Sequence, residues 1–169
     1  MFTQKALLTK WGLYSAAVLL FLVLQQFLSG LSPLIGIVPF LIPIIVAVVS
    51  ALEGPIAGTI FGTVIGFLCD LYGGGVVSGI YTISFFAIAL VISLISRYYV
   101  MHNVFGSLIY ALIAFLILDS IQALAALLWK GAALSALVPL IGGEIAASIL
   151  FTIPIFFVFR YLNRLFRYE

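Results

Sequence analysis

Three carboxylates lie within otherwise apolar stretches of the sequence, and they are the residues most capable of chemistry. They are Asp70, Asp119 and Glu144, and Gln122 follows Asp119 by about one helical turn. A carboxylate in membrane hydrocarbon is costly and usually faces a bundle interior or a water-filled cavity. We therefore expect these four residues to line a polar cavity in the outer half of the membrane, with Asp119 as its deepest acid. The alternative is that Asp70 and Glu144 lie at the water boundary without a specific role.

Catalytic chemistry is not expected from these residues. Two intramembrane aspartates can share a proton, as in an aspartic protease, but the glycine-framed motif of such acids is missing around both Asp70 and Asp119. The only histidine, His102, lies in a separate segment, so its position in the sequence indicates neither a histidine-based dyad nor a metal cluster. We expect no enzymatic activity, no metal and no cofactor.

The composition indicates where these acids must be placed. Of the 169 residues, 66% are hydrophobic and only 7% are charged, and the mean hydropathy is +1.39. These values exclude a soluble domain and indicate an all-α integral membrane protein with a single transmembrane domain over residues 1–169. The net charge of only +2 gives no surface for nucleic acid.

Six membrane-spanning helices fit this length. The expected spans cover residues 11–29, 33–52, 54–72, 78–96, 104–129 and 137–159. The second contains Pro33, Pro39 and Pro43, so we expect it to be kinked or partly unwound. A tight hairpin at Glu53 joins it to the third.

The basic residues predict an orientation, because Lys and Arg are enriched on the cytoplasmic side of short loops. With six spans, one side receives Lys5, Lys10, Arg97, Arg160, Arg164 and Arg167, and the other receives only Lys130. Both termini are therefore predicted to be cytoplasmic, and Lys130 is an available partner for an outer acid. The basic C-terminal end predicts an anchor to lipid headgroups, with docking of a cytoplasmic partner as the alternative.

Glycine recurs at every fourth position in the third span. Gly54, Gly58, Gly62 and Gly66 lead in steps of four to Asp70. Residues four apart lie on neighbouring turns of a helix, and small residues let helix backbones approach closely in lipid. We expect a helix-packing seam, used inside the protein, with a partner's span as the alternative occupant.

The segment "ALEGPIAGTIFGTVIGFLCDLYGGGVVSGIY" resembles the MreD family, the rod-shape-determining membrane proteins of the bacterial cell-wall elongation machinery. The family pattern is a hairpin with a charged residue and Gly, spaced glycines, an aspartate near the end of the span, and a glycine-containing loop. The residues that match it here are Glu53, Gly54, Gly58, Gly62, Gly66, Asp70 and Gly79.

This resemblance implies a non-enzymatic scaffold in the bacterial cytoplasmic (inner) membrane. The implied partners are MreC and, directly or through it, MreB, the polymerase RodA and its penicillin-binding transpeptidase. It also implies that Arg97, Arg160, Arg164 and Arg167 contact cytoplasmic filaments or anionic membrane lipid.

A second resemblance remains open. The chain is also distantly similar to the substrate-capturing S component of energy-coupling-factor transporters, a six-helix fold that captures a vitamin or metal in an outward-facing pocket. Asp70, Asp119 and Glu144 suit such a pocket. The expected outer loops, however, are short and poor in the aromatic residues that would line and close it. MreD is therefore the favoured reading, and a six-helix bundle similar to the S component is the expected fold.

Overall fold

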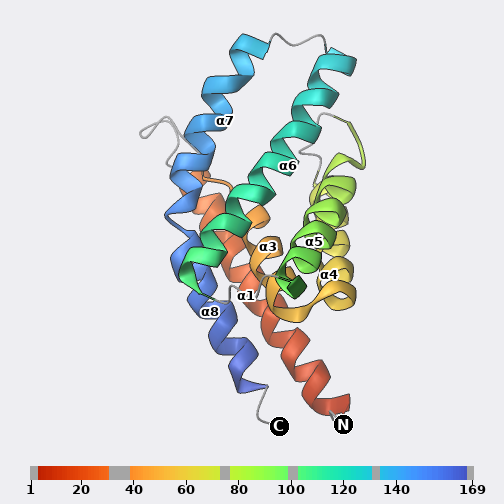
Figure 1. Cartoon of the computed structure of the whole chain (residues 1–169), viewed down its shortest axis with the longest axis vertical. Coiled ribbons are helices and arrows are strands. Elements are labelled where there is room, and N and C mark those ends of the chain that lie inside the picture. Colours follow the sequence, from red (N-terminus) through yellow and green to blue (C-terminus); the bar gives the residue numbers. More distant parts are fainter. Residues whose placement is uncertain (1–3, 31–38, 73–76, 99–102, 131–133, 167–169) are drawn as a thin grey trace.

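A computed structural model describes residues 4–30, 39–72, 77–98, 103–130 and 134–166, and within these ranges it contains helices and no strand. The helices are labelled in Figure 1. They are α1 (Gln4–Gly30), α3 (Ile42–Glu53), α4 (Pro55–Leu71), α5 (Ile80–Tyr98), α6 (Val104–Lys130), α7 (Leu134–Ile149) and α8 (Thr152–Leu165). The all-helical class expected from the sequence is confirmed for this part of the chain.

Three of these helices are long and apolar enough to cross a membrane. They contain the segments Leu7–Gly30, Ile80–Tyr98 and Val104–Trp129, and the bent pair α7–α8 makes a fourth if it acts as one span. Helices α3 and α4 are apolar but have only 12 and 17 residues. The described part of the chain therefore supports a multi-pass membrane protein with three to four candidate spanning helices, and the expected number of six spans is not confirmed.

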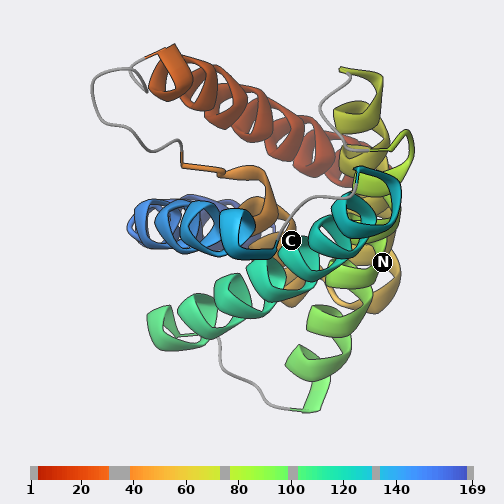
Figure 2. The same ribbon diagram turned by 90° about the horizontal axis from the view of Figure 1, so that it is seen from above.

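Helix α3 lies at the centre of the molecule. Every residue from Leu41 to Ser50 is buried, and α3 packs against α1, α4, α5, α6 and α8 (Figure 2). A helix that is hydrophobic on all sides is either a core helix or a lipid-facing span, and the burial of α3 shows that it is a core helix. Helices α1, α4, α5, α6 and α8 therefore form a shell around α3, whereas α7 packs on α6 and α8. Many outward side chains of these helices are large and apolar.

The two ends of α3 are held by polar side chains from other helices. At its start, the Phe40 amide donates to Ser148 Oγ (2.8 Å) and the Leu41 amide donates to Gln25 Oε1 (3.0 Å). Residues 39–41 are not helical, and Pro43 lies in the first turn of α3, where its missing amide hydrogen leaves no intrahelical bond unmade. In the described part of the expected span over 33–52, helix α3 begins at Ile42 after the non-helical residues 39–41, and Pro33 lies outside the described residues.

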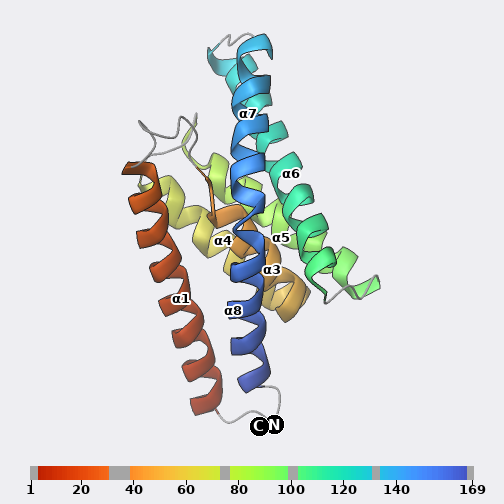
Figure 3. The ribbon, with the colours of Figure 1, turned by 90° about the vertical axis from the view of Figure 1, so that its left-hand side faces the viewer.

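The last expected span, 137–159, is divided into two helices. Helices α7 and α8 bend by 49° at a short break (Figure 3), where the Phe151 amide donates to the Ser148 carbonyl (3.0 Å). Pro154 explains the break, because its ring carries no amide hydrogen and would clash with the Leu150 carbonyl in a continuous helix. The C-terminal end of α8 lies at the same end of the molecule as the start of α1, whereas α7 extends to the opposite end (Figures 1 and 3).

Three of the four regularly spaced glycines lie where α4 meets its neighbours. A Cβ atom added to Gly58 would lie 2.7 Å from Ser50 Cα on α3. At Gly62 it would lie 2.7 Å from Ala89 Cβ, and at Gly66 2.6 Å from the Tyr81 carbonyl oxygen, both on α5. The structure therefore uses this seam inside the protein.

Gly54, the first glycine of the series, lies outside the seam. It has a φ of +84° between α3 and α4, and nothing lies within 4 Å of an added Cβ. A positive φ is strained for residues with a side chain, so this glycine serves the turn rather than the packing.

We predict that Gly62→Leu lowers the free energy of unfolding by more than about 3 kcal/mol, beyond the usual cost of an overpacked core. The reason is that even one added carbon meets Ala89 and the Phe85 carbonyl oxygen, at 2.7 and 2.8 Å. The matched control is Ile60→Leu on the outward face of α4, where the side chain is 60% exposed. Chemical unfolding in detergent micelles measures both variants, and equal stability would contradict the seam.

Candidate functional site

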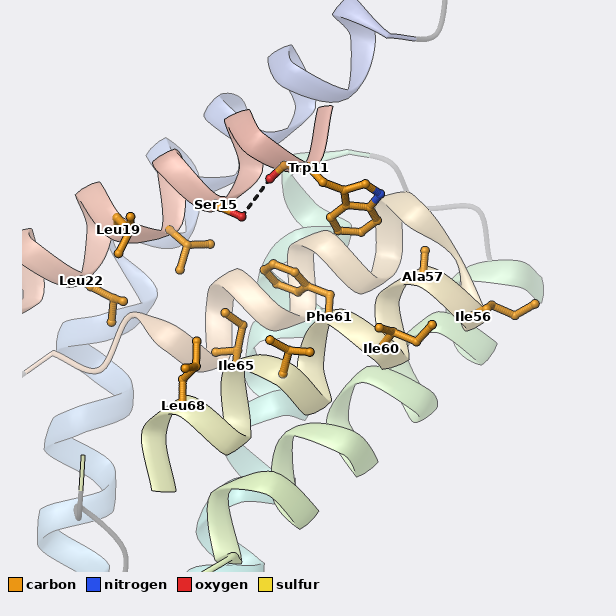
Figure 4. A pocket seen from close by; sticks show the side chains of 12 residues that line it. Trp11, Ser15, Leu19, Leu22, Ile56, Ala57, Ile60, Phe61, Ile65 and Leu68 are labelled. Atoms are coloured by element: carbon orange, nitrogen blue, oxygen red, sulfur yellow. Dashed lines mark hydrogen bonds between the residues drawn. The ribbon is translucent and has the colours of Figure 1, made fainter. Parts of the chain in front are cut away.

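The prominent cavity is an apolar groove between α1 and α4, with a volume of about 540 Å³ (Figure 4). We call it the α1–α4 groove. One wall is formed by five α1 residues, Trp11, Ser15, Val18, Leu19 and Leu22. The other wall includes the α4 residues Ile56, Ala57, Ile60, Phe61, Ile65 and Leu68. Ser15 Oγ donates to the Trp11 carbonyl of its own helix (2.9 Å), so the groove offers little free polarity.

The groove exists because α4 has two different faces and α1 stands away from it. Gly58, Gly62 and Gly66 face α3 and α5, whereas Ile56 and Ile60, two residues out of phase, project into the groove. In the described part of the chain, α1 packs against α8 and α3 and not directly against the α4 backbone. At one end the Trp11 and Phe61 rings approach each other, with centroids 6.2 Å apart.

A buried polar cluster fixes that end of the groove. Glu53, the last residue of α3, accepts hydrogen bonds from Lys10 Nζ (2.6 Å), the Tyr14 hydroxyl (2.6 Å) and Asn163 Nδ2 (2.7 Å). The side chains of Lys10 and Glu53 are only 18% and 8% exposed, and Tyr14 is fully buried. These four residues, which we call the Glu53 cluster, join α1, the α3–α4 hairpin and α8.

Sequence reasoning missed the Glu53 cluster as a site. It placed Glu53 in the hairpin and counted Lys10 only as a cytoplasmic charge. The available signal was that Glu53 is, apart from the C-terminal Glu169, the one acid on the side that is predicted to receive most of the basic residues. Its partners are 39 to 110 residues away in the sequence, so only the fold could identify them.

Asp70 is used to begin another helix. Its Oδ1 accepts the Tyr81 amide (3.1 Å), and its Oδ2 accepts the Thr82 amide (2.8 Å) and the Thr82 hydroxyl (2.5 Å). Tyr81 and Thr82 lie in the first turn of α5, where amides have no intrahelical partner. A carboxylate from α4 thus does the work of an N-cap side chain and also complements the helix dipole.

The other acids of the expected polar cavity lie near one another between α5, α6 and α7. Asp119 and Gln122 are on α6, and Glu144 on α7 lies within electrostatic range of Asp119. The Gln122 side chain is hydrogen-bonded to Tyr81 on α5. Asp119 Oδ2 is buried without a hydrogen-bond partner among the described residues. Of the four predicted residues, Asp119, Gln122 and Glu144 therefore lie together. Asp70 is connected to them only through its hydrogen bond with the Tyr81 amide.

The predicted basic contacts lie at helix ends. Arg97 is exposed in the last turn of α5, and Arg164 is exposed in the last turn of α8. The Arg160 guanidinium lies over the Phe156 ring, 5.4 Å from its centroid. Arg167 and the Lys130 side chain lie outside the described residues. The cytoplasmic side assigned to these residues stays a prediction.

Comparison of the chain with protein-family models, with curated proteins and with solved structures found no match. Its function is therefore argued from its own residues. Within the described residues, no group of three or more His, Cys, Asp or Glu side chains is arranged to hold a metal ion.

We predict that Lys10→Met lowers the free energy of unfolding by about 3 kcal/mol, because it leaves the Glu53 carboxylate buried without its cation. The double variant Lys10→Met/Glu53→Gln removes that unpaired charge and should be more stable than Lys10→Met alone. Chemical unfolding in detergent of the parent, both single variants and the double variant gives the coupling energy. Simple additivity of the two single losses would contradict a coupled pair.

We also predict that Asp70→Ala lowers the free energy of unfolding by about 1–2 kcal/mol, the usual cost of losing a helix cap. Asp70→Asn should lose less, since its single side-chain oxygen can still accept the Thr82 amide and hydroxyl, although its NH2 group cannot accept the Tyr81 amide. The same unfolding assay compares them. A loss in Asp70→Asn as large as in Asp70→Ala would contradict a cap that one acceptor oxygen can maintain, and would indicate that the intact carboxylate is required.

Proposed function

We propose that this chain is a non-enzymatic scaffold of the bacterial cell-wall elongation complex, similar to MreD. In this role it lies in the cytoplasmic membrane with both termini in the cytoplasm. It binds MreC and, directly or through MreC, associates with MreB, RodA and its penicillin-binding transpeptidase.

The observation that carries this proposal is the use of the residues that match the MreD pattern. Gly58, Gly62 and Gly66 are covered by neighbouring helices, Glu53 is bound by three side chains, and Asp70 caps α5. Each of these residues holds the α3–α4–α5 unit together. Residues that are all used for internal packing are not available for a reaction. Their use therefore supports a protein that acts through its surface.

The surfaces left for partners are apolar helix faces. Large exposed side chains include Val23 on α1 and Leu116 on α6, which are 70% and 62% exposed. In a membrane, spans of other proteins can pack on such faces. Because the seam glycines are already covered, we assign partner contacts to these outer faces and not to the seam.

A second candidate function is retained because of one observation. Asp119 Oδ2 has no hydrogen-bond partner among the described residues and lies near Glu144, as a ligand-binding pocket of an S component would require. Against it, the prominent cavity is apolar and lies elsewhere, whereas small-molecule sites combine apolar walls with several convergent polar groups.

The deciding experiment is affinity purification from native membranes in mild detergent, with mass spectrometry of co-purifying proteins and retained small molecules. We expect to recover MreC and the elongation polymerase. Recovery of a pair of ATPases with their membrane coupling subunit, or of a vitamin, would overturn the scaffold proposal.

Asp119→Asn is the informative variant in this experiment. We predict that it leaves the recovery of MreC within about twofold of the parent, because a scaffold needs only its surfaces. Ser120→Ala, at the exposed neighbouring position, is the matched control. A loss of MreC that is specific to Asp119→Asn would place Asp119 in the partner interface.

A further inference from the structure

We propose that the α1–α4 groove is a binding site for one hydrocarbon chain of a membrane lipid. This inference goes beyond the proposed function and does not depend on it. It rests on the shape and lining of the groove, on its length and on the way its walls are held.

The residues that line the groove suit a flexible hydrocarbon chain better than a transmembrane helix of another protein. Eight of the twelve lining residues are Val, Leu or Ile, and only Ser15 and Ala57 are small. Helices that pack closely in a membrane use small residues at the contact. The small residues of α4 lie on its opposite face, where α3 and α5 already cover them.

The size of the groove also favours a single chain. From Trp11 to Leu22 its α1 wall rises about 16 Å, which is close to the roughly 15 Å of one leaflet's hydrocarbon. The length of the groove therefore matches one hydrocarbon chain of one leaflet.

The two ends of the groove differ in chemistry. Trp11 lies beside the Glu53 cluster, and its amphipathic ring is of the kind that settles at the headgroup level. The opposite end, at Leu22 and Leu68, is apolar (Figure 4). This polarity orients the lipid, with its headgroup at the end of the Glu53 cluster and its chain running toward Leu68.

The groove is held open before any lipid enters. Lys10 and Tyr14 tie one end of α1 to Glu53, and Gln25 ties the other end to the Leu41 amide. Because both ends of the wall are fixed, binding requires little reorganisation. Bulk lipid is equally apolar, so the preference for a bound chain comes from contact with these fixed walls.

The test is native mass spectrometry of the full chain after exchange into lipid-free detergent. We expect the parent to retain one phospholipid per chain. Ala57→Phe fills the groove and should reduce that retention at least tenfold. The matched control is Ala16→Phe, which lies on α1, is exposed and is outside the lining. Ser15→Phe fills the groove from the α1 wall, in case Ala57→Phe does not fold.

A second measurement locates the bound hydrocarbon chain of the lipid. Trp129→Phe leaves Trp11 as the only tryptophan, and titration with brominated phosphatidylcholine should quench its fluorescence to saturation near one lipid per chain. Ala57→Phe should abolish this saturable quenching. No retained lipid in the parent, or equal retention in Ala57→Phe and Ala16→Phe, would overturn the lipid site. Recovery of MreC in the separate purification would be unaffected by that result.

Discussion

The structure depends on one constraint, which is that a short, fully buried helix must find partners for its polar ends without water. Helix α3 meets this requirement at both termini. Ser148 and Gln25 accept the amides before its first turn, and the Ala51 carbonyl near its last turn accepts the Ser96 hydroxyl (2.9 Å). Glu53 closes the same end with three donors. Since these partners come from α1, α5, α7 and α8, completing α3 also places the helices around it.

This constraint explains why α1 can form a groove. The contacts of α1 are concentrated at Lys10, Tyr14 and Gln25, with the Tyr14 and Phe21 rings packed on Phe159 of α8. None of these contacts requires α1 to approach the α4 backbone. A helix that is fixed toward its ends and packed on one side leaves its other side available to lipid.

The intramembrane acids have acquired two different roles. Asp70 and Glu53 are surrounded by donors, so each stabilises the junction of two or more helices. Asp119 retains a buried oxygen without a partner in the described part of the chain, with Glu144 near it. Buried polar atoms are almost always satisfied in folded proteins. Among the described residues Asp119 Oδ2 and Thr152 Oγ1 are the two exceptions, and the carboxylate is the one at which a ligand, a water molecule or a partner would be expected.

The sequence by itself determined the membrane class, the approximate positions of the helices and the glycine seam, because hydropathy and a spacing of four are local properties of the chain. The seam's inward orientation, which the spacing left open, required the positions of Ser50 and Ala89. The break at Pro154 was visible in the sequence and was missed in favour of a continuous apolar run. Only the tertiary structure decided the Glu53 cluster and the α1–α4 groove, because both join residues that no local pattern relates. The physical reason is that a buried charge binds partners, and a groove is formed by helices, that are close in space and not in the sequence.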